Sequence, residues 1–179
     1  MRSSDSSSSK MHRVEHPTPQ EDRAPQEILK FFLQKMETAN YNIKELTIEH
    51  KTDIMRLVVM LNPNIPHDVL ESRLFKMFKI QSYKCFGIFD KDVLIGVTSC
   101  WYTVRYYSGA QIEIDNVVID EAYRSKGIGK IFLDYITDWA RKNDCETIEL
   151  NTYVGNHRSH KFYFDQGYKI LGFHFQKQI

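Results

Sequence analysis

The chain has 179 residues, of which 42% are hydrophobic and 26% are charged, and its formal net charge at pH 7 is +1. A balance this close to neutral gives no bias toward nucleic acid or an anionic membrane, and no apolar run is long enough to span a bilayer. The three cysteines are an odd number, which favours free thiols in a reducing compartment over a disulfide framework. We therefore expect a cytoplasmic protein with neither nucleic acid nor a membrane among its partners.

The N-terminal segment differs in composition from the rest of the chain. Residues 1–25 are rich in serine and proline mixed with charged residues, so they are predicted to be disordered. Apolar side chains then recur at helical spacing, which predicts an extra amphipathic helix over residues 26–39. We therefore expect one folded domain, over residues 26–179, after the disordered segment.

A strand and two helices are predicted next along the chain. Apolar and polar residues alternate over residues 43–48, which predicts a strand. Thr52 or Asp53 is expected to cap a helix that ends at Leu61, because short polar side chains accept hydrogen bonds from the first helical N–H groups. Pro66 is expected to begin the following helix, since its fixed φ suits the first turn.

The rest of the chain alternates strands with helices. The predicted strands share alternation or enrichment in β-branched and aromatic residues, and they cover residues 83–89, 93–106, 111–119, 147–153 and 168–177. Helices follow the third and fourth of these strands, ending near Asn143 and before Gly167. This order predicts a single α/β (α+β) domain with a mixed, mostly antiparallel central sheet flanked by helices.

Residues 123–130 form the most informative part of the sequence, because they join a predicted strand to the start of a predicted helix. The first N–H groups of a helix have no partner inside it, and the helix dipole makes that end positive. Gly127 and Gly129 let the backbone approach a ligand closely. Three cations add positive charge to the turn: Arg124, Lys126 and Lys130. The pattern predicts a phosphate-binding turn.

The sequence excludes three other kinds of glycine-rich loop, each by a particular residue or spacing. A dinucleotide-binding fingerprint needs a third glycine, but Phe132 stands three positions after Gly129. A Walker A loop needs serine or threonine after its lysine, but Ile131 follows Lys130. An RNA-binding Gly-x-x-Gly loop needs two intervening residues, whereas only one separates Gly127 from Gly129.

Two segments of the chain resemble the signatures of a known family. Residues 117–120, Val-Val-Ile-Asp, followed by the phosphate-binding turn, resemble the acyl-CoA motif of the GNAT superfamily of N-acetyltransferases. Residues 156–163, followed by a Gly-Tyr pair, resemble its second signature, although Ser159 stands where a small residue, often alanine, is usual. The resemblance covers residues 43–179, with a predicted strand between the two signatures.

The resemblance implies a GNAT-like sheet that is splayed between its fourth and fifth strands, with acetyl-CoA as the co-substrate that donates the acetyl group. A backbone N–H at or near Val117 or Val118 is then expected to hold the oxyanion. Asn156 is expected to bond the pantetheine arm or to cap its helix, and Asn151 to bond the pantetheine amide or to close the splayed sheet. The implied coenzyme-binding residues are Val117, Val118, Ile119, Arg124, Ser125, Lys126, Gly127, Ile128, Gly129, Lys130, Asn151, Asn156 and Tyr163.

Three residues are the main candidates for proton transfer. By its position in the second signature, Tyr163 is the expected general acid, since a phenol with a pKa near ~10 can protonate a leaving thiolate. Glu113 and Asp115 share a strand face just upstream of the oxyanion site, and either is a candidate general base or a charge that orders the acceptor. Glu149 is a weaker candidate. No metal is expected, because the histidines of the second signature suit surface positions better than ligation.

The acceptor is less sharply defined. By resemblance to the family, residues 62–82 and 101–109 shape its pocket. The second of these is aromatic and includes Arg105, so it suits a cationic amine, an anionic acceptor group or a homodimer contact. We expect transfer to a primary amine of a small molecule. The alternatives are a protein or peptide N-acetyltransferase, which needs an open groove, and a non-catalytic acyl-CoA-binding regulator, against which Tyr163 speaks.

Overall fold

The computed structural model describes residues 41–179, so the disorder predicted over residues 1–25 and the helix predicted over residues 26–39 lie outside the described residues. Within the described part, one five-stranded sheet has the order β1-β2-β3-β4-β5. Neighbouring strands are antiparallel except for β4 and β5, which are parallel. The strands are β1 (Tyr41–Glu45), β2 (Tyr83–Asp90), β3 (Val93–Arg105), β4 (Gly109–Ile119) and β5 (Thr147–Leu150).

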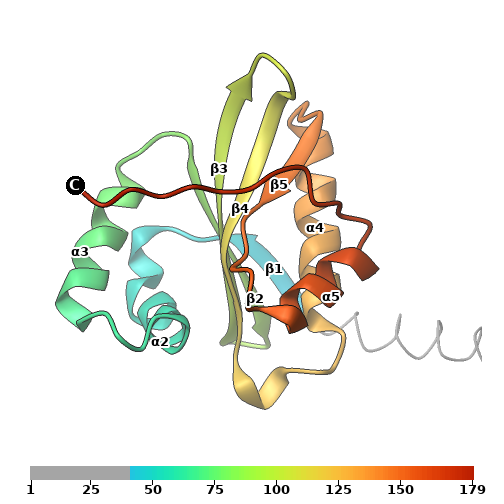
Figure 1. The fold of residues 1–179 in the computed structure, drawn as a ribbon. Coiled ribbons are helices and arrows are strands. Elements are labelled where there is room, and N and C mark those ends of the chain that lie inside the picture. The colour runs from blue at the N-terminus through green and yellow to red at the C-terminus, as the bar shows by residue number, and fades with distance from the viewer. Residues whose placement is uncertain (1–40) are drawn as a thin grey trace, which may run out of the picture. The chain divides into compact units, whose positions relative to one another are not determined.

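Helices cover both faces of the sheet, with α2 and α3 on one face and α4 and α5 on the other (Figure 1). Short 3-10 turns stand before α2 and before the loop that leads into α4. The helices are α2 (Lys51–Leu61), α3 (His67–Phe78), α4 (Ile128–Lys142) and α5 (His157–Asp165), and the 3-10 turns are Ile48–His50 and Glu121–Tyr123. The predicted α/β (α+β) fold, a mixed and mostly antiparallel sheet flanked by helices, is confirmed.

Each face of the sheet has its own hydrophobic core. α4 buries Ile128, Phe132 and Ile136, which recur every four residues and so form one stripe along the helix. This stripe packs against buried side chains of the sheet that include Phe86 and Ile112. On the other face, a separate cluster joins α2 and α3 to the sheet. Because Ile128 is the first residue of α4, the core fixes the phosphate-binding turn directly before it.

β4 contains a bulge near its C-terminal end. Val118 pairs with Val97 of β3 and Asp115 pairs with Ser99, so two residues of β4 stand opposite one residue of β3. One of these two residues, Asn116, has a φ of 52°, in the left-handed region that asparagine tolerates better than most side chains.

The bulge reverses which side chains of β4 face which core. Before it, Ile112 and Ile114 pack in the cluster beneath α4. After it, Val117 and Ile119 pack in that cluster, whereas Val118 packs in the cluster beneath α2 and α3. Side chains alternate along a regular strand, so one extra residue exchanges the two faces.

β4 and β5 separate after a short paired stretch. Their pairing runs from Gln111 with Thr147 to Ile114 with Leu150, where β5 ends. Residues 115–119 continue β4 with β3 beside them on one edge only. The splay predicted between the fourth and fifth strands therefore has a counterpart in the structure.

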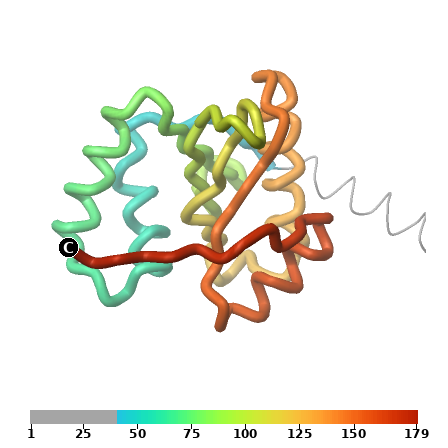
Figure 2. The backbone as a smooth tube through the Cα atoms, turned by 45° about the horizontal axis from the view of Figure 1, so that its top comes forward, coloured from blue at the N-terminus to red at the C-terminus, as the bar shows by residue number. Residues whose placement is uncertain are grey.

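The last predicted strand, over residues 168–177, is wrong for the chain as described. Residues 169–179 have no regular secondary structure, and their side chains are exposed. Figures 1 and 2 show this red segment running across the strands of the sheet instead of beside one of them. An alternating sequence becomes a strand only where a neighbouring strand supplies its backbone hydrogen bonds.

The predicted start of α2 is also wrong. Thr52 and Asp53 lie inside the helix and do not cap it. The chain turns earlier, in the 3-10 turn, where the backbone N–H of Thr47 donates to Nδ1 of His50 at 3.3 Å. A polar side chain signals a helix start, but neighbouring polar residues compete for that position, so the signal is uncertain by several residues.

Candidate active site

The predicted phosphate-binding turn, residues 123–130, leads into α4 and includes its first residues. Its positions Ser125 and Gly127 are both left-handed, with φ of 63° and 77°, and Gly127 is the N-cap residue of α4. The Gly127 carbonyl accepts from the N–H of Lys130 at 3.0 Å and so closes the first turn of the helix. N–H groups at this end have no preceding turn to donate to, so they form a cradle suited to phosphate oxygens.

The packing of α5 explains why position 129 is a glycine, which the sequence alone did not indicate. A Cβ atom placed on it would lie 3.2 Å from the ring of Phe162, closer than an ordinary van der Waals contact. α4 and α5 therefore approach each other closely at the first turn of α4. The two glycines differ in role, because Gly127 shapes the turn whereas Gly129 leaves room for α5.

Two of the predicted cations make ion pairs at the turn. Arg124 donates through Nε to the Ile119 carbonyl at 3.0 Å and through Nη1 to Glu121 at 2.9 Å. Lys130 donates to Asp134 at 2.7 Å. Both basic side chains are still 40% and 48% exposed, so these ion pairs are weak and do not prevent either cation from turning to a phosphate.

Arg158 adds a cation that sequence reasoning did not place at the turn. Its Nη2 donates to the hydroxyl of Ser125 at 3.2 Å and so links the first turn of α5 to the phosphate-binding turn. The third predicted cation, Lys126, lies over the ring of Tyr123 with its Nζ 5.1 Å from the centroid. The signal that could have found Arg158 was its place near the start of the second signature.

Asp120 ties the turn to α2. Its Oδ2 accepts from Nη1 of Arg56 at 2.6 Å, and its Oδ1 accepts from the N–H of Ala122 at 3.1 Å. Arg56 also donates through Nη2 to the Leu94 carbonyl at 2.5 Å. The hydrogen bond from Arg56, followed by that from Ala122, holds the pKa of Asp120 below its usual range.

We expect Asp120→Asn to reduce the loss of stability in acid. A carboxyl with a lowered folded pKa stabilises the fold above its unfolded pKa of 3.8, and this contribution disappears as the pH falls through the folded value. Urea unfolding followed between about pH 6 and pH 3 should show a smaller loss for the variant than for the wild-type chain. Asp134→Asn, on the exposed face of α4, is the matched control. Equal losses in wild type and Asp120→Asn would contradict the assignment.

The predicted oxyanion residues lie at and after the bulge of β4. Val117 and Ile119 point into one core and Val118 into the other, so their side chains are structural. Toward β3, the backbone is paired up to Asp120, whose N–H donates to the Ile95 carbonyl at 2.8 Å. The opposite edge is not paired by a strand, because β5 has ended at this level. Core side chains and a ligand-facing backbone are therefore compatible here.

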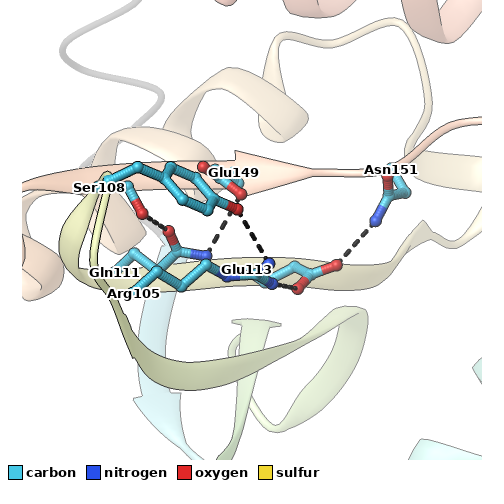
Figure 3. A network of polar contacts seen from close by, with 7 residues as sticks. Arg105, Ser108, Gln111, Glu113, Glu149 and Asn151 are labelled. Carbon is cyan, nitrogen blue, oxygen red and sulfur yellow. Dashed lines mark hydrogen bonds and ion pairs between the residues drawn. The ribbon is translucent and has the colours of Figure 1, made fainter. Parts of the chain in front are cut away.

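Glu113, on β4, is linked to the end of β3 and to the residue that follows β5 (Figure 3). Its Oε1 accepts from Nδ2 of Asn151 at 2.7 Å, and its Oε2 accepts from Nη2 of Arg105 at 3.2 Å. Arg105 also donates to the hydroxyl of Tyr107 at 3.0 Å. Asn151 directly follows β5, so its contact with Glu113 closes the sheet where the strands part, which is one of its two predicted roles.

Glu149 is held in the same network by a buried amide. Nε2 of Gln111 donates to Oε2 of Glu149 at 3.3 Å, and the hydroxyl of Ser108 donates to the other amide atom, Oε1 (Figure 3). Gln111 is fully buried, so these bonds satisfy a polar group inside the sheet. Glu149 therefore has a structural partner at its predicted position.

Asp115 lies on the same face of β4 as Glu113 but in different surroundings. It stands opposite Ser99 of β3, and its side chain is exposed. Oδ1 accepts from the backbone N–H of Asn116 at 2.9 Å, and Oδ2 accepts from Nδ2 of Asn116 at 2.8 Å. Among residues 41–179, Asp115 is not part of an ion pair with lysine or arginine. It is thus the carboxylate of the two that faces solvent.

Tyr163 is half-buried on α5. Its ring centroid lies 5.3 Å from that of Phe162 and 5.6 Å from that of Tyr168. Burial raises the pKa of Tyr163 above its ordinary value, and it raises the pKa of Tyr168 to about 12. A phenol with a raised pKa stays protonated at neutral pH, which is what a proton donor requires.

The start of α5 holds the remaining predicted residues. Oδ1 of Asn156 accepts from the N–H of Ser159 at 3.3 Å, so Asn156 caps the helix, one of its two predicted roles. The rings of His157 and His160 lie 6.0 Å apart, and Nε2 of His160 is 3.0 Å from the Tyr153 carbonyl. Within residues 41–179, no group of three or more histidine, cysteine, aspartate or glutamate side chains is placed to hold a metal.

The aromatic residues predicted for the acceptor pocket do not form one wall. Trp101 packs on Tyr83, with ring centroids 5.0 Å apart, in the cluster beneath α2 and α3. Tyr102 lines a separate groove of about 860 Å³ beside the C-terminal end of α4. Tyr106 and Tyr107 are exposed where β3 leads into β4. Trp101 lies on the same face of β3 as Ser99, and it pairs with Glu113 of β4.

The phosphate-binding turn, the splayed strands and the second signature helix thus occur in one domain, in the arrangement that the resemblance implies. The model of the acetyltransferase (GNAT) family matches residues 52–168. The chain belongs to the GNAT acetyltransferase family. The match runs from the first turn of α2 to Tyr168, so it includes every candidate residue of this GNAT domain.

Known proteins agree with this assignment. The protein named uncharacterized N-acetyltransferase YhdJ of Bacillus subtilis (strain 168) is 26% identical over 140 residues, which cover 77% of this GNAT chain and 99% of YhdJ. The aminoglycoside N-acetyltransferase AAC(6')-Iy in complex with CoA shares the fold with a TM-score of 0.69 at 16% identity, over 78% of this chain and 94% of that one. The same enzyme with the bisubstrate analogue CoA-S-monomethyl-acetylneamine gives a TM-score of 0.68 at 16% identity, over 78% and 99%. In residues 41–179 of this GNAT domain, every helix is too short or too polar to cross a bilayer.

Proposed function

We propose that this GNAT domain transfers an acetyl group from acetyl-CoA to a primary amine of a small molecule. The observation that carries the proposal is the end of β4–β5 pairing at Ile114 and Leu150, immediately before residues 117–119 and the phosphate-binding turn. A ligand that is phosphorylated at one end and reactive at the other fits such an arrangement, because the turn takes the phosphates and the open strand edge takes the reactive end.

The coenzyme is proposed to lie along the N-terminal end of α4. N–H groups of the turn and of the first turn of α4 would bind its pyrophosphate, helped by the flanking cations. The pantetheine arm would follow the open edge of β4, with Asn156 at the start of α5 beside it. The residues proposed for coenzyme binding are those of residues 117–119 and 124–130 together with Asn151, Asn156 and Tyr163, and Arg158 joins them through its contact with Ser125.

Transfer requires a neutral amine, a stabilised oxyanion and a protonated leaving group. An alkyl ammonium has a pKa near ~10, so a base must take its proton before the nitrogen attacks the thioester carbon. The new C–N bond forms as the carbonyl oxygen gains charge, which a backbone N–H at Val117 or Val118 would bind. The C–S bond then breaks, and Tyr163 would give its proton to the departing sulfur. The phenol of Tyr163, whose pKa burial raises, carries its proton at neutral pH and is therefore available as a donor.

Asp115 is the better candidate base. The Glu113 carboxylate is occupied by Arg105 and Asn151, whereas the Asp115 carboxylate faces solvent and, among the hydrogen bonds of residues 41–179, bonds only to Asn116. We expect Asp115→Asn to lower kcat/KM at pH 7 by about 100-fold, and to recover activity as the pH rises and the amine deprotonates unaided. Glu113→Gln, which removes the charge and keeps one acceptor oxygen for either Arg105 or Asn151, is the matched control and should change kcat/KM by less than about tenfold. A larger effect of Glu113→Gln with restored activity at high pH would transfer the role to Glu113.

A panel of amine acceptors tests the proposed function. The full chain is incubated with acetyl-CoA and polyamines, aminophosphonates, aminoglycosides or peptides with free N-termini, while the free thiol of CoA is followed. We expect turnover with at least one small amine and a mass increase of one acetyl group on its nitrogen. Turnover with peptides alone would replace the small molecule by a protein acceptor. Coenzyme binding without turnover on any acceptor would favour a regulator that binds acyl-CoA.

The analogue-bound neighbour supports a small acceptor at the level of the fold. The enzyme in that complex is named for an aminoglycoside, and its analogue joins CoA to an acetylneamine. At 16% identity this likeness concerns the fold, so the aminoglycosides enter the panel as one arm among several.

A further inference from the structure

The side chain of Asn116 makes contacts that its backbone conformation does not require. A left-handed φ of 52° suits glycine or aspartate as well as asparagine, so the bulge alone does not select an amide. Nδ2 of Asn116 donates to Oδ2 of Asp115 at 2.8 Å and to the hydroxyl of Ser99 at 3.1 Å. An amide nitrogen carries two hydrogens, so these two bonds use both of them.

Asn116 holds both oxygens of the Asp115 carboxylate. Its backbone N–H donates to Oδ1 at 2.9 Å, and its side-chain amide donates to Oδ2 at 2.8 Å. The terminal torsion of an aspartate otherwise rotates over a broad range, and the Asp115 side chain is exposed. Two donors from one residue therefore fix the plane of the carboxylate, and each oxygen keeps a lone pair that can accept a proton.

Ser99 anchors the Asn116 amide to the interior of the sheet. Ser99 is only 2% exposed, and its Oγ also donates to the backbone carbonyl of Asp115 at 3.3 Å. The phenol of Tyr83, on β2, shares a hydrogen bond with the same hydroxyl. Burial raises the pKa of Tyr83, so this phenol is neutral at pH 7. The contacts thus run from a buried, uncharged anchor to a carboxylate at the surface.

We propose that Asn116 is a positioning residue for Asp115, and that its two donors orient the carboxylate to take a proton from the acceptor amine. The inference rests on the proposed function, in which Asp115 is the base. A freely rotating carboxylate spends little time in the geometry for proton transfer, so loss of the amide should lower the rate. Asp115 directly follows Ile114, the last residue of β4 that pairs with β5, so the contact lies where the two strands part.

Two variants of Asn116 remove the amide in different ways. Asn116→Gly keeps the left-handed backbone and its N–H, and is expected to lower kcat at pH 7 by about tenfold while the KM for acetyl-CoA stays within about threefold. Asn116→Asp keeps the size of the side chain but replaces the donor by a like charge, so its loss should be at least as large. Lys91→Gly, at another left-handed position (φ of 53°), is the control and should stay within about twofold of wild type.

A double-mutant cycle separates positioning of Asp115 from support of the backbone. In the Asp115→Asn chain, Asn116→Gly should lower kcat/KM by less than about twofold, because no base remains to be positioned. A tenfold loss in both chains, about equal to that in the single variant, would show that Asn116 serves only the bulge and would overturn the proposal. A wild-type chain that acetylates no acceptor of the panel would overturn the proposed function and this role together.

The side-chain amide of Asn116 gives a second readout that needs no acceptor. Its NH₂ signal in a 15N–1H correlation spectrum is assigned by its loss in Asn116→Gly. We expect this signal to move in both Asp115→Asn and Ser99→Ala, because each variant removes one partner of the amide. The NH₂ signal of Asn143, whose Nδ2 donates to the Trp139 carbonyl, should not move in either. An Asn116 signal that stays in place in both variants would overturn the proposal whatever the kinetics show.

Discussion

Replacing Tyr163 by phenylalanine is expected to lower kcat by about 100-fold or more and to leave the KM for acetyl-CoA within about threefold. The substitution removes the proton that the leaving thiolate would take, but it keeps the ring that packs beside Phe162 and Tyr168. The sulfur must then leave as an anion or take its proton from water. Steady-state kinetics with the best acceptor of the panel, followed through release of the CoA thiol, measures the change.

Tyr168→Phe is the matched control for this prediction. It removes the hydroxyl of the neighbouring tyrosine, whose ring lies 5.6 Å from that of Tyr163, and should leave kcat within about threefold. Equal losses in both variants would point to a shared effect on packing, which the thermal stability of the two variants would reveal. Unchanged turnover of Tyr163→Phe would show that the proton comes from another donor.

Gly129→Asp is expected to weaken CoA binding by at least about 100-fold. The carboxylate would lie in the first turn of α4, where its charge opposes that of the pyrophosphate. Its Cβ would also meet the ring of Phe162, which lies 3.2 Å from that position and must give way by a few tenths of an ångström. Calorimetric titration of the full chain with CoA measures the affinity independently of any acceptor.

Gly129→Ala separates the two causes. It introduces the same Cβ without charge, and Phe162 need move by only a few tenths of an ångström. We expect it to weaken CoA binding by less than about tenfold. An affinity unchanged in Gly129→Asp would remove the phosphate site from this turn, whereas an equal loss in both variants would show that helix packing, and not charge, controls the site.

The sequence predicted the framework of the site because local signals and tertiary structure agree there. The strand before the turn, the left-handed Gly127 and the apolar stripe from Ile128 onward each favour the observed strand–turn–helix unit. The mixed sheet followed from the order of strands and helices for the same reason. The pairing of β2 with β3 was also predictable, since two alternating segments flank a short polar turn.

Features that depend on distant contacts could not be predicted. Nothing in the sequence around Gly129 indicates that Phe162 lies beside it. The ion pair of Glu113 with Arg105 arises from a cross-strand register that the alternation of side chains alone does not fix. The two candidate carboxylates therefore looked equivalent in sequence, and only the folded arrangement distinguishes them. The C-terminal segment was predicted as a strand from its own pattern, but pattern alone cannot supply the neighbouring strand whose hydrogen bonds a strand needs.

The bulge at Asn116 constrains the number of residues in β4, and this constraint does not depend on any single side chain. Glu113 and Asp115 precede the extra residue, whereas Val117 to Ile119 and the phosphate-binding turn follow it. Loss of one residue here would exchange the faces of the side chains in one half of the strand relative to the other half. Either the carboxylates or the phosphate-binding turn would then lie on the wrong face of the sheet. The number of residues in β4 therefore keeps the carboxylates and the phosphate-binding turn in their correct relative orientation.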